Sequence, residues 1–368
     1  MANVFDAERW AAVPFHFWSL VFFVFGSIVG SFLNVCIHRM PRGESIVSPP
    51  SHCPHCRYSI PWFLNIPLAT WLFLKGKCRN CRAPISARYF LVELLTGVLF
   101  LACWLKFGPR SAVVALVYCA LVAGLVVATF IDFEHFIIPD EITIGGTIAG
   151  FVISLLVPAL HHATHAMTSA RESFLGLLVG GGLVYGILRL GKLLFGRQKI
   201  SLEPGTRLIF TETAIQFPDE EIKFEDLFYR NSDVVIFQAE SIELLGRVFK
   251  DVPVRLSPKR LIVGEELFDP EKVTHMEAVT GEIIIPREAM GFGDVKFMAA
   301  IGAFLGWPAV LFSLMASSMI GALVGLGLIV ARRQEWSSRL PYGPYIAMGA
   351  VLWMFAGREW VARWLGSM

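Results

Sequence analysis

Apolar runs with almost no charged residues dominate the hydrophobicity pattern of this chain. Most of them are long enough to cross a hydrocarbon layer of about 30 Å as helices. The sixth run is short and is joined to the seventh only by a Leu-Gly-Trp segment, which predicts a tight helical hairpin. The pattern predicts an all-α polytopic membrane protein with about eight transmembrane helices. The runs cover residues 18–37, 90–105, 112–131, 142–160, 174–188, 297–304, 308–330 and 345–356.

A cleaved secretory signal peptide is the alternative interpretation of the first apolar run. No basic segment precedes the run, and residues 30–35, Gly-Ser-Phe-Leu-Asn-Val, make a poor cleavage site. We therefore expect a helix that the protein retains.

One long segment, residues 197–290, does not follow the membrane pattern. It contains 12 Lys and Arg and 18 Asp and Glu, which gives a net charge of −6. Apolar and polar residues alternate near 207–215, 233–237 and 260–263, and this period of two is typical of strands. These features predict a soluble, β-rich, acidic insertion between the fifth and sixth transmembrane helices.

The composition agrees with a membrane protein. Hydrophobic residues make up 55% of the chain and charged residues 17%, with a mean hydropathy of +0.59; charged residues usually make up about a quarter of a soluble domain. The formal net charge of +2 is the sum of two unequal parts. The acidic segment carries −6, and the rest of the chain, with 20 basic and 12 acidic residues, carries +8. No global basic field favours nucleic acid, so we expect no nucleic-acid partner.

The distribution of basic residues predicts the orientation in the membrane, because Lys and Arg resist translocation. The loop at 38–89 carries many basic residues and one acid, Glu44, so we expect it on the cytoplasmic side. Both termini then face outward, and the scheme places Arg332, Arg333 and Arg339 inside. Two arginines near the outer C-terminus depart from this scheme.

Four cysteines in the basic loop predict a metal site. Cys53 and Cys56 form one CxxC pair, Cys78 and Cys81 form another, and 21 residues separate the pairs. Each CxxC turn presents two thiolates, so the two turns together complete a tetrahedral zinc site. Disulfides are the alternative, but the expected cytoplasmic location is reducing. Because four thiolates leave no open coordination position, we expect the zinc to have a structural role.

Two aspartates are expected at the cytoplasmic ends of apolar helices. Asp132 ends the third apolar run, and Asp294 precedes the sixth within Gly291-Phe-Gly-Asp-Val-Lys296. Two carboxylates that share a partly apolar site hold one proton between them. The ionised group can then activate a water while the protonated group polarises a carbonyl, as in aspartyl peptide hydrolysis. The spacing alone leaves open the interpretation that both carboxylates only solvate helix ends.

These features divide the chain into five parts. An outer N-terminus and the first transmembrane helix occupy 1–37, and the cytoplasmic four-cysteine zinc domain occupies 38–89. Transmembrane helices two to five follow at 90–196, and the acidic β-rich cytoplasmic insertion at 197–290. The Gly-Phe-Gly-Asp motif and transmembrane helices six to eight complete the chain at 291–368.

The ordered motifs of the chain are similar to those of the bacterial prepilin peptidases, or type IV leader peptidases, of the GxGD class of intramembrane aspartyl proteases. The resemblance covers nearly all of the chain except the insertion. It implies that Asp132 and Asp294 are the catalytic pair. The motifs are the Gly-Ser-Phe-Leu-Asn-Val run, the two CxxC pairs, Asn65-Ile-Pro-Leu, Gly76-Lys-Cys-Arg, the segments 84–96 and 132–140, Gly291-Phe-Gly-Asp-Val-Lys and Pro341-Tyr-Gly-Pro344.

The resemblance also implies substrates, a cofactor and a location. The substrates are type IV prepilins and type II secretion pseudopilins, cut at a Gly–Phe type junction after a basic leader. Many members also methylate the new N-terminus with S-adenosylmethionine, an activity linked to the zinc-bearing region. The implied location is the bacterial inner membrane, with lipid around the chain and the active site at the cytoplasmic face. No Rossmann-type glycine motif follows a strand, so methyl transfer rests on the resemblance alone.

Several polar residues and the insertion have open roles. Glu93 is a candidate methylation-site residue or an acid paired with Arg88, Asp140 is expected to cap a helix, and Lys296 to extend toward lipid headgroups. The insertion departs from the family pattern and could steer a basic leader or an assembly protein by charge. Two other functions stay open: a peptidase without methylation, and a zinc-stabilised non-enzymatic scaffold for pilus or secretion assembly.

Overall fold

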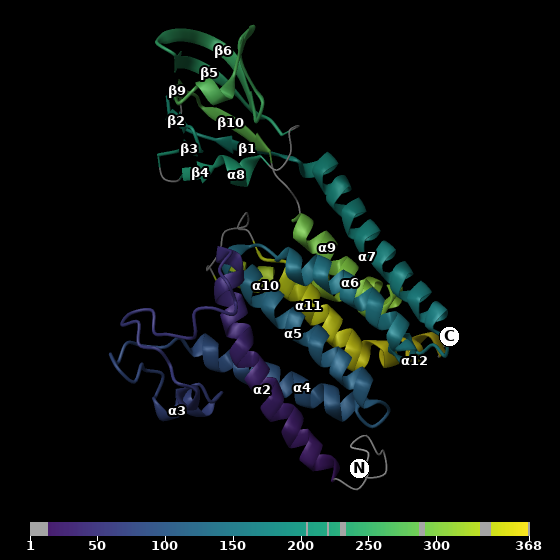
Figure 1. Cartoon of the computed structure of the whole chain (residues 1–368). Helices are drawn as coiled ribbons and strands as arrows, with labels where there is room; N and C mark the ends of the chain where they lie inside the picture. Colours follow the sequence, from purple (N-terminus) through teal and green to yellow (C-terminus); the bar gives the residue numbers. More distant parts are fainter. Residues whose placement is uncertain are drawn as a thin grey trace. The chain divides into compact units, whose positions relative to one another are not determined.

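The computed structural model describes residues 14–203, 205–218, 221–228, 233–286, 291–331 and 340–366. These residues form two compact units, one made of Met1–Tyr185 with Phe292–Met368 and the other of Gly186–Gly291. The first unit is helical and the second contains the sheet (Figure 1). Arg332, Arg333 and Arg339, which the sequence places on the inner side, lie outside the described residues.

Five helices in the described ranges are long and apolar enough to cross a membrane. Three other apolar runs form shorter helices, so the expected number of about eight spans is not established. Two of these three carry residues of the candidate site. The five long segments are Phe15–Arg42, Ala87–Phe107, Ala112–His135, Ala166–Leu194 and Trp307–Val330.

The helical elements follow the apolar runs closely. Gly306 alone separates α9 from α10, as expected for a tight hairpin. The fourth run ends early, because Pro158 begins a short 3₁₀ turn after α6. The helices are α2 (Phe15–Arg39), α3 (Ala69–Phe73), α4 (Ala87–Phe107), α5 (Ala112–His135), α6 (Asp140–Leu156), α7 (Ala166–Phe195), α9 (Phe292–Leu305), α10 (Trp307–Val330), α11 (Gly343–Leu352) and α12 (Arg358–Gly366), with a π-helical turn at Trp353–Gly357 before α12.

Glycines allow close helix packing in the first unit. A Cβ on Gly30 of α2 would lie 2.8 Å from Glu93 Cα of α4, and one on Gly97 of α4 would lie 2.5 Å from Ser27 Oγ. A Cβ on Gly176 of α7 would lie 2.0 Å from the Gly302 carbonyl oxygen of α9. Small residues at such crossings are typical of membrane helices, where close approach replaces the hydrophobic effect.

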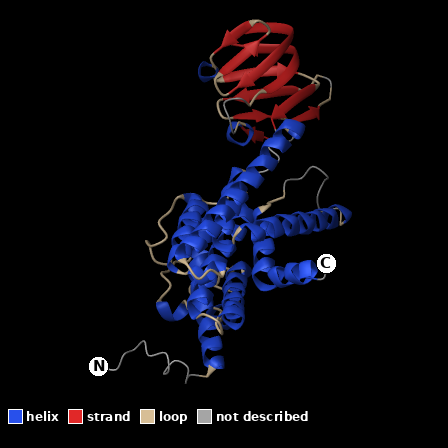
Figure 2. Cartoon of the chain, turned by 90° about the vertical axis from the view of Figure 1, so that its right-hand side faces the viewer, coloured by secondary structure: helices blue, strands red, loops and turns tan. Residues whose placement is uncertain are grey.

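The second unit contains a ten-stranded antiparallel sheet (Figure 2). The strands pair in the order β4-β3-β2-β9-β5-β6-β7-β8, and β10 pairs with both β1 and β5. The one segment expected as a strand near 207–215 forms two strands, which a turn separates. The strands are β1 (Arg197–Ser201), β2 (Arg207–Thr211), β3 (Ala214–Gln216), β4 (Glu221–Lys223), β5 (Val235–Leu244), β6 (Arg247–Ser257), β7 (Arg260–Val263), β8 (Glu266–Phe268), β9 (His275–Val279) and β10 (Glu282–Pro286), with α8 at Phe224–Leu227.

The sheet has an apolar core of its own. Alternate residues at the start of β5 are buried, namely Val235, Phe237 and Ala239, and Phe210 of β2 stacks on Phe237 with ring centroids 5.4 Å apart. The alternation of apolar residues in the sequence therefore corresponds to the inward face of a sheet.

An ion pair joins the end of α7 to the segment before β5. Lys192 Nζ lies 2.7 Å from the carboxylate of the buried Asp233.

Candidate functional site

Asp132 lies in the last turn of α5 with its side chain buried, the residue being 5% exposed. The backbone N–H of Gly343, at the start of α11, donates a hydrogen bond to Asp132 Oδ2 at 2.9 Å. The helix ends directly afterwards, because Phe136 adopts a left-handed conformation with φ of 55°. The carboxylate is thus fixed by a backbone donor from a distant part of the sequence.

Asp294 lies in the first turn of α9 and is buried, with 7% exposed. Ile138, in the segment between α5 and α6, lies next to Gly293, which precedes Asp294, and next to Gly343, which contacts Asp132. A Cβ on Gly343 would lie 2.7 Å from Asp132 Oδ2 and 3.0 Å from Ile138 Cδ1, and a Cβ on Gly293 would lie 3.5 Å from Ile138 Cβ. The two aspartate-bearing helix ends therefore lie around one buried isoleucine.

Ion pairs surround these helix ends. Lys296 of α9 pairs with Asp140, the first residue of α6, rather than extending toward lipid headgroups. Asp140 does not cap that helix, because Pro139 occupies the N-cap position and no side chain accepts a capping hydrogen bond. Arg88 pairs with Glu134 of α5 and not with Glu93. Both pairs connect different helices next to the aspartates.

Glu93 of α4 is buried, with 8% exposed. Its Oε2 accepts a hydrogen bond from the backbone N–H of Leu68 at 2.7 Å. Leu68 has a φ of 60°, a conformation that side-chain-bearing residues rarely adopt. Glu93 therefore connects α4 to the cysteine-bearing segment through the backbone.

The Pro341-Tyr-Gly-Pro344 segment contributes more to the site than the sequence analysis assigned to it. The Tyr342 hydroxyl forms hydrogen bonds with Ser317 at 2.8 Å and Ser318 at 3.0 Å, both on α10. Gly343 follows at once and approaches Asp132 so closely that a side chain would not fit. A glycine between a tyrosine and a proline is a sequence signal for a close backbone approach at residue 343. The sequence does not indicate that the group it approaches is the Asp132 carboxylate.

The four cysteines gather in one cluster, with all four sulfurs within 4.8 Å of one another. The Sγ atoms of Cys53 and Cys81 are 3.8 Å apart, and those of Cys56 and Cys78 are 4.0 Å apart. A tetrahedral zinc ion with bonds of about 2.3 Å separates its sulfurs by about 3.8 Å. The spacing of the cluster therefore fits such an ion.

The two cysteine turns have the same backbone geometry. Arg57 and Arg82, each directly after the second cysteine of a pair, both have positive φ, of 56° and 62°. Their N–H groups donate to the carbonyls of Cys53 at 2.8 Å and Cys78 at 3.0 Å. A hydrogen bond from the Tyr58 backbone is the main reason why the pKa of the Cys56 thiol falls to about 6. At Cys56 the turn thus favours the thiolate, which is the metal-binding form.

Other candidate residues lie apart from both clusters. Cys36, Cys103 and Cys119 lie buried on α2, α4 and α5, away from the four-cysteine cluster in the sequence. His161, in the short 3₁₀ turn after α6, contacts α9, because its Nε2 lies 3.2 Å from the Ala303 carbonyl oxygen. Burial lowers the pKa of the His161 ring, which disfavours its charged form.

Two family models match the chain. Residues 24–107 match the bacterial peptidase A24 N-terminal domain, which includes the four cysteines. Residues 119–200 and 269–326 match the type IV leader peptidase family, and these ranges include Asp132 and Asp294. The intervening residues without a match lie in the sheet unit.

Three relatives illustrate the similarity. A prepilin leader peptidase/N-methyltransferase of Aeromonas hydrophila is 28% identical, over 96% of this chain and 94% of its own length. One of Myxococcus xanthus is 33% identical, over 84% of this chain and 62% of its own length. A type 4 prepilin-like proteins leader peptide-processing enzyme of Escherichia coli is 36% identical, over 50% of this chain and 71% of its own length. No solved structure matches the chain.

Proposed function

The chain belongs to the type IV leader peptidase family, and from that premise we propose that it cleaves prepilins and methylates their new N-termini. The substrates are type IV prepilins and type II secretion pseudopilins, cut after a basic leader at a Gly–Phe type junction. The protein would act as a multi-pass enzyme of the bacterial inner membrane, with its active site at the cytoplasmic face. Five helices of suitable length and the basic cysteine segment support this location.

The observation that carries the peptidase proposal is the burial of Asp132 and Asp294 at two helix ends around Ile138. Burial makes a shared proton favourable, because two charged carboxylates are costly in a low-dielectric site. The ionised carboxylate takes a proton from water as the oxygen attacks the scissile carbonyl, and the protonated carboxyl donates to the carbonyl oxygen. The tetrahedral intermediate then collapses as the amine leaves with a proton.

A cleavage assay in membranes tests this assignment. Asp132→Asn and Asp294→Asn keep the side-chain shape and remove the charge, so each should lower prepilin cleavage at least 100-fold. Asp140→Asn is the matched control, because Asp140 lies nearby on α6 but its side chain is 60% exposed and paired with Lys296. Cleavage at the wild-type rate by either catalytic variant would contradict the assignment.

We assign methyl transfer to the region that carries the cysteine cluster. The names of relatives such as the Aeromonas hydrophila protein support this activity, and the four cysteines lie in the range that matches the A24 N-terminal domain. S-adenosylmethionine would supply the methyl group, and a zinc ion held by the four cysteines would fold the segment without taking part in chemistry. Mass spectrometry of the mature pilin N-terminus, with and without the methyl donor, distinguishes this enzyme from a peptidase without methylation. Normal assembly supported by a double aspartate variant would select the scaffold alternative.

We assign the sheet unit to substrate or partner recognition by charge. Its net charge of −6 over residues 197–290 is opposite to that of a basic leader. Deletion of residues 197–288, with a short linker in their place, should slow cleavage at low ionic strength and have less effect at high ionic strength. An unchanged rate at every ionic strength would make the unit a passive insertion.

A further inference from the structure

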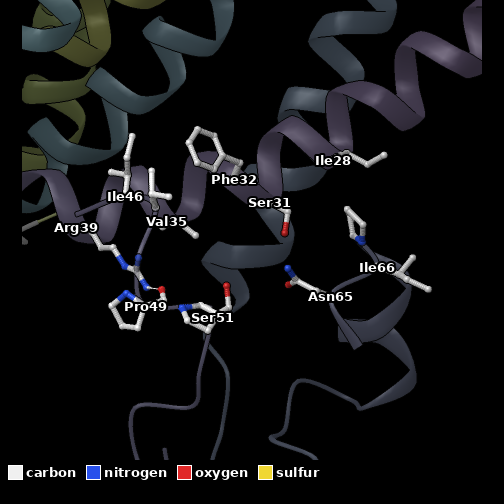
Figure 3. Close-up of a pocket in the computed structure, with 13 residues that line it drawn as sticks. Ile28, Ser31, Phe32, Val35, Arg39, Ile46, Pro49, Ser51, Asn65 and Ile66 are labelled. Atoms are coloured by element: carbon white, nitrogen blue, oxygen red, sulfur yellow. Dashed lines mark hydrogen bonds between the residues drawn. The ribbon is translucent and has the colours of Figure 1, made fainter. Parts of the chain in front are cut away.

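A cavity of about 500 Å³ lies between α2 and two loops of the cysteine-bearing segment (Figure 3). One wall is a face of α2, where Ser31, Val35 and Arg39 follow at successive turns. The opposite wall includes Ser51 and Asn65. Cavities of this size, with apolar walls and a few polar groups, are typical of small-molecule sites.

Arg39 provides a buried positive charge at one end of the cavity. The residue is 7% exposed, and its guanidinium donates hydrogen bonds to the carbonyls of Ser45 at 2.9 Å and Pro49 at 2.7 Å. Among the described residues, no carboxylate lies within ion-pair distance of it. Buried charges are normally paired, and a guanidinium matches a carboxylate well, so this end suits an anionic group of a ligand.

Glu93 provides a buried carboxyl group behind the part of the cavity wall that Ser31 forms. Its carboxylate lies against the Ser31 side chain and accepts from the backbone N–H of Leu68, which directly follows a cavity residue, Pro67. No Lys, Arg or His of the described ranges forms an ion pair with it. Ser31 and Arg39 are eight residues apart on one helix, about 12 Å along its axis. The cavity thus has the Arg39 guanidinium in its wall and the Glu93 carboxyl group behind Ser31, two turns away along α2.

We propose that this cavity binds the methyl donor, an inference that rests on the proposed methyltransferase function. S-adenosylmethionine carries a carboxylate, which suits Arg39, and a sulfonium, which the charge of Glu93 attracts. Its nucleoside is large and partly apolar, as are the Phe32, Val35 and Ile66 surfaces of the cavity. The cavity residues all fall within the range that matches the A24 N-terminal domain.

Binding to the purified full-length protein tests the location. Equilibrium dialysis with radiolabelled S-adenosylmethionine should show at least tenfold weaker binding by Val35→Trp, because the indole fills the cavity. Val24→Trp is the matched control: it places the same side chain on the same helix, at an exposed position outside the cavity. Its affinity should equal that of the wild type. Zinc content and thermal unfolding show whether each variant is folded.

The charge argument has its own test. The wild type should bind S-adenosylmethionine more tightly than S-adenosylhomocysteine, which has the same shape but no sulfonium charge. Glu93→Gln keeps the hydrogen-bonding shape and should reduce this preference at least threefold. Arg39→Lys should weaken both ligands, because an ammonium cannot form the two-pronged contact of a guanidinium with a carboxylate. An unchanged preference in Glu93→Gln would overturn the proposed orientation by charge.

The outcomes separate this inference from the proposed function. Equal binding by the wild type and a folded Val35→Trp overturns the location but leaves methyl transfer in place. Absence of binding by the wild type overturns methyl transfer and this site together. If Val35→Trp keeps its affinity for the methyl donor but loses co-purified anionic phospholipid, the cavity is a lipid headgroup site and the proposal is wrong.

Discussion

Gly343 donates its backbone N–H to Asp132 Oδ2 at 2.9 Å and joins the end of α5 to the start of α11. No side chain fits at this glycine, because a Cβ would lie 2.7 Å from the same carboxylate oxygen. The contact therefore fixes both the direction of the Asp132 carboxylate and the identity of residue 343. It makes Gly343 a positioning residue for the proposed chemistry.

The first prediction concerns this contact. Gly343→Ala should lower prepilin cleavage about 10- to 100-fold, because its methyl group displaces the Asp132 carboxylate, and displacements near 1 Å cost that much in other enzymes. The effect should fall on kcat more than on KM, since the substrate groups that bind elsewhere are unchanged. Gly327→Ala on α10 is the control, because its added Cβ would have no neighbour within 4 Å. A Gly343→Ala enzyme with wild-type kcat would contradict the positioning role.

The second prediction concerns the crossing of α7 and α9. Gly176→Ala should destabilise the protein by about 1–3 kcal/mol, because overpacking forces helices apart, and the added Cβ would lie 2.0 Å from the Gly302 carbonyl oxygen. Since α9 carries Asp294, cleavage should fall as well. Gly182→Ala on the same helix meets no atom within 4 Å and should leave the unfolding temperature unchanged or raise it slightly. Thermal unfolding in one detergent compares the two variants.

The third prediction concerns the cysteine cluster. Cys78→Ser should remove bound zinc and lower the unfolding temperature, because a serine hydroxyl is a poor substitute for a thiolate ligand. Cleavage should persist in part, because the role proposed for the cluster is to stabilise the fold and not to take part in peptide hydrolysis. Cys103→Ala, at a buried cysteine on α4, should keep a full zinc content by elemental analysis. Equal zinc content in Cys78→Ser and the wild type would rule out the four-cysteine site.

Much of this arrangement could be predicted from the sequence, because its signals are local. Apolar runs gave the helices, and CxxC spacing gave a four-cysteine cluster that the structure forms. The position of Asp132 at a helix end followed from where an apolar run stops. Periodicity of two predicted strands near 207–215, but the turn that divides them was missed, because Glu212 and Thr213 carry no glycine or proline signal.

Pairings between distant residues could not be predicted, because they depend on how helices pack. Lys296 and Asp140 are far apart in sequence, and nothing local indicates that they meet. Arg88 forms an ion pair with Glu134 of α5 and not with Glu93 of its own helix, and no local pattern in the sequence distinguishes the two partners. Glu93 instead accepts a backbone hydrogen bond from Leu68, a residue whose positive φ has no sequence signal.

The fourth prediction separates Glu134 from Asp132, although only one residue lies between them. The Glu134 side chain is 41% exposed and pairs with Arg88, so the ion pair contributes at most about 1 kcal/mol and weakens as salt rises. Glu134→Gln should therefore change cleavage less than about fivefold, and the difference from wild type should vanish at high salt. The double variant Arg88→Gln with Glu134→Gln should cleave prepilin no more slowly than either single variant, because the first substitution already removes the ion pair. A 100-fold loss in Glu134→Gln at every salt concentration would instead place that carboxylate in the chemistry, beside the buried pair.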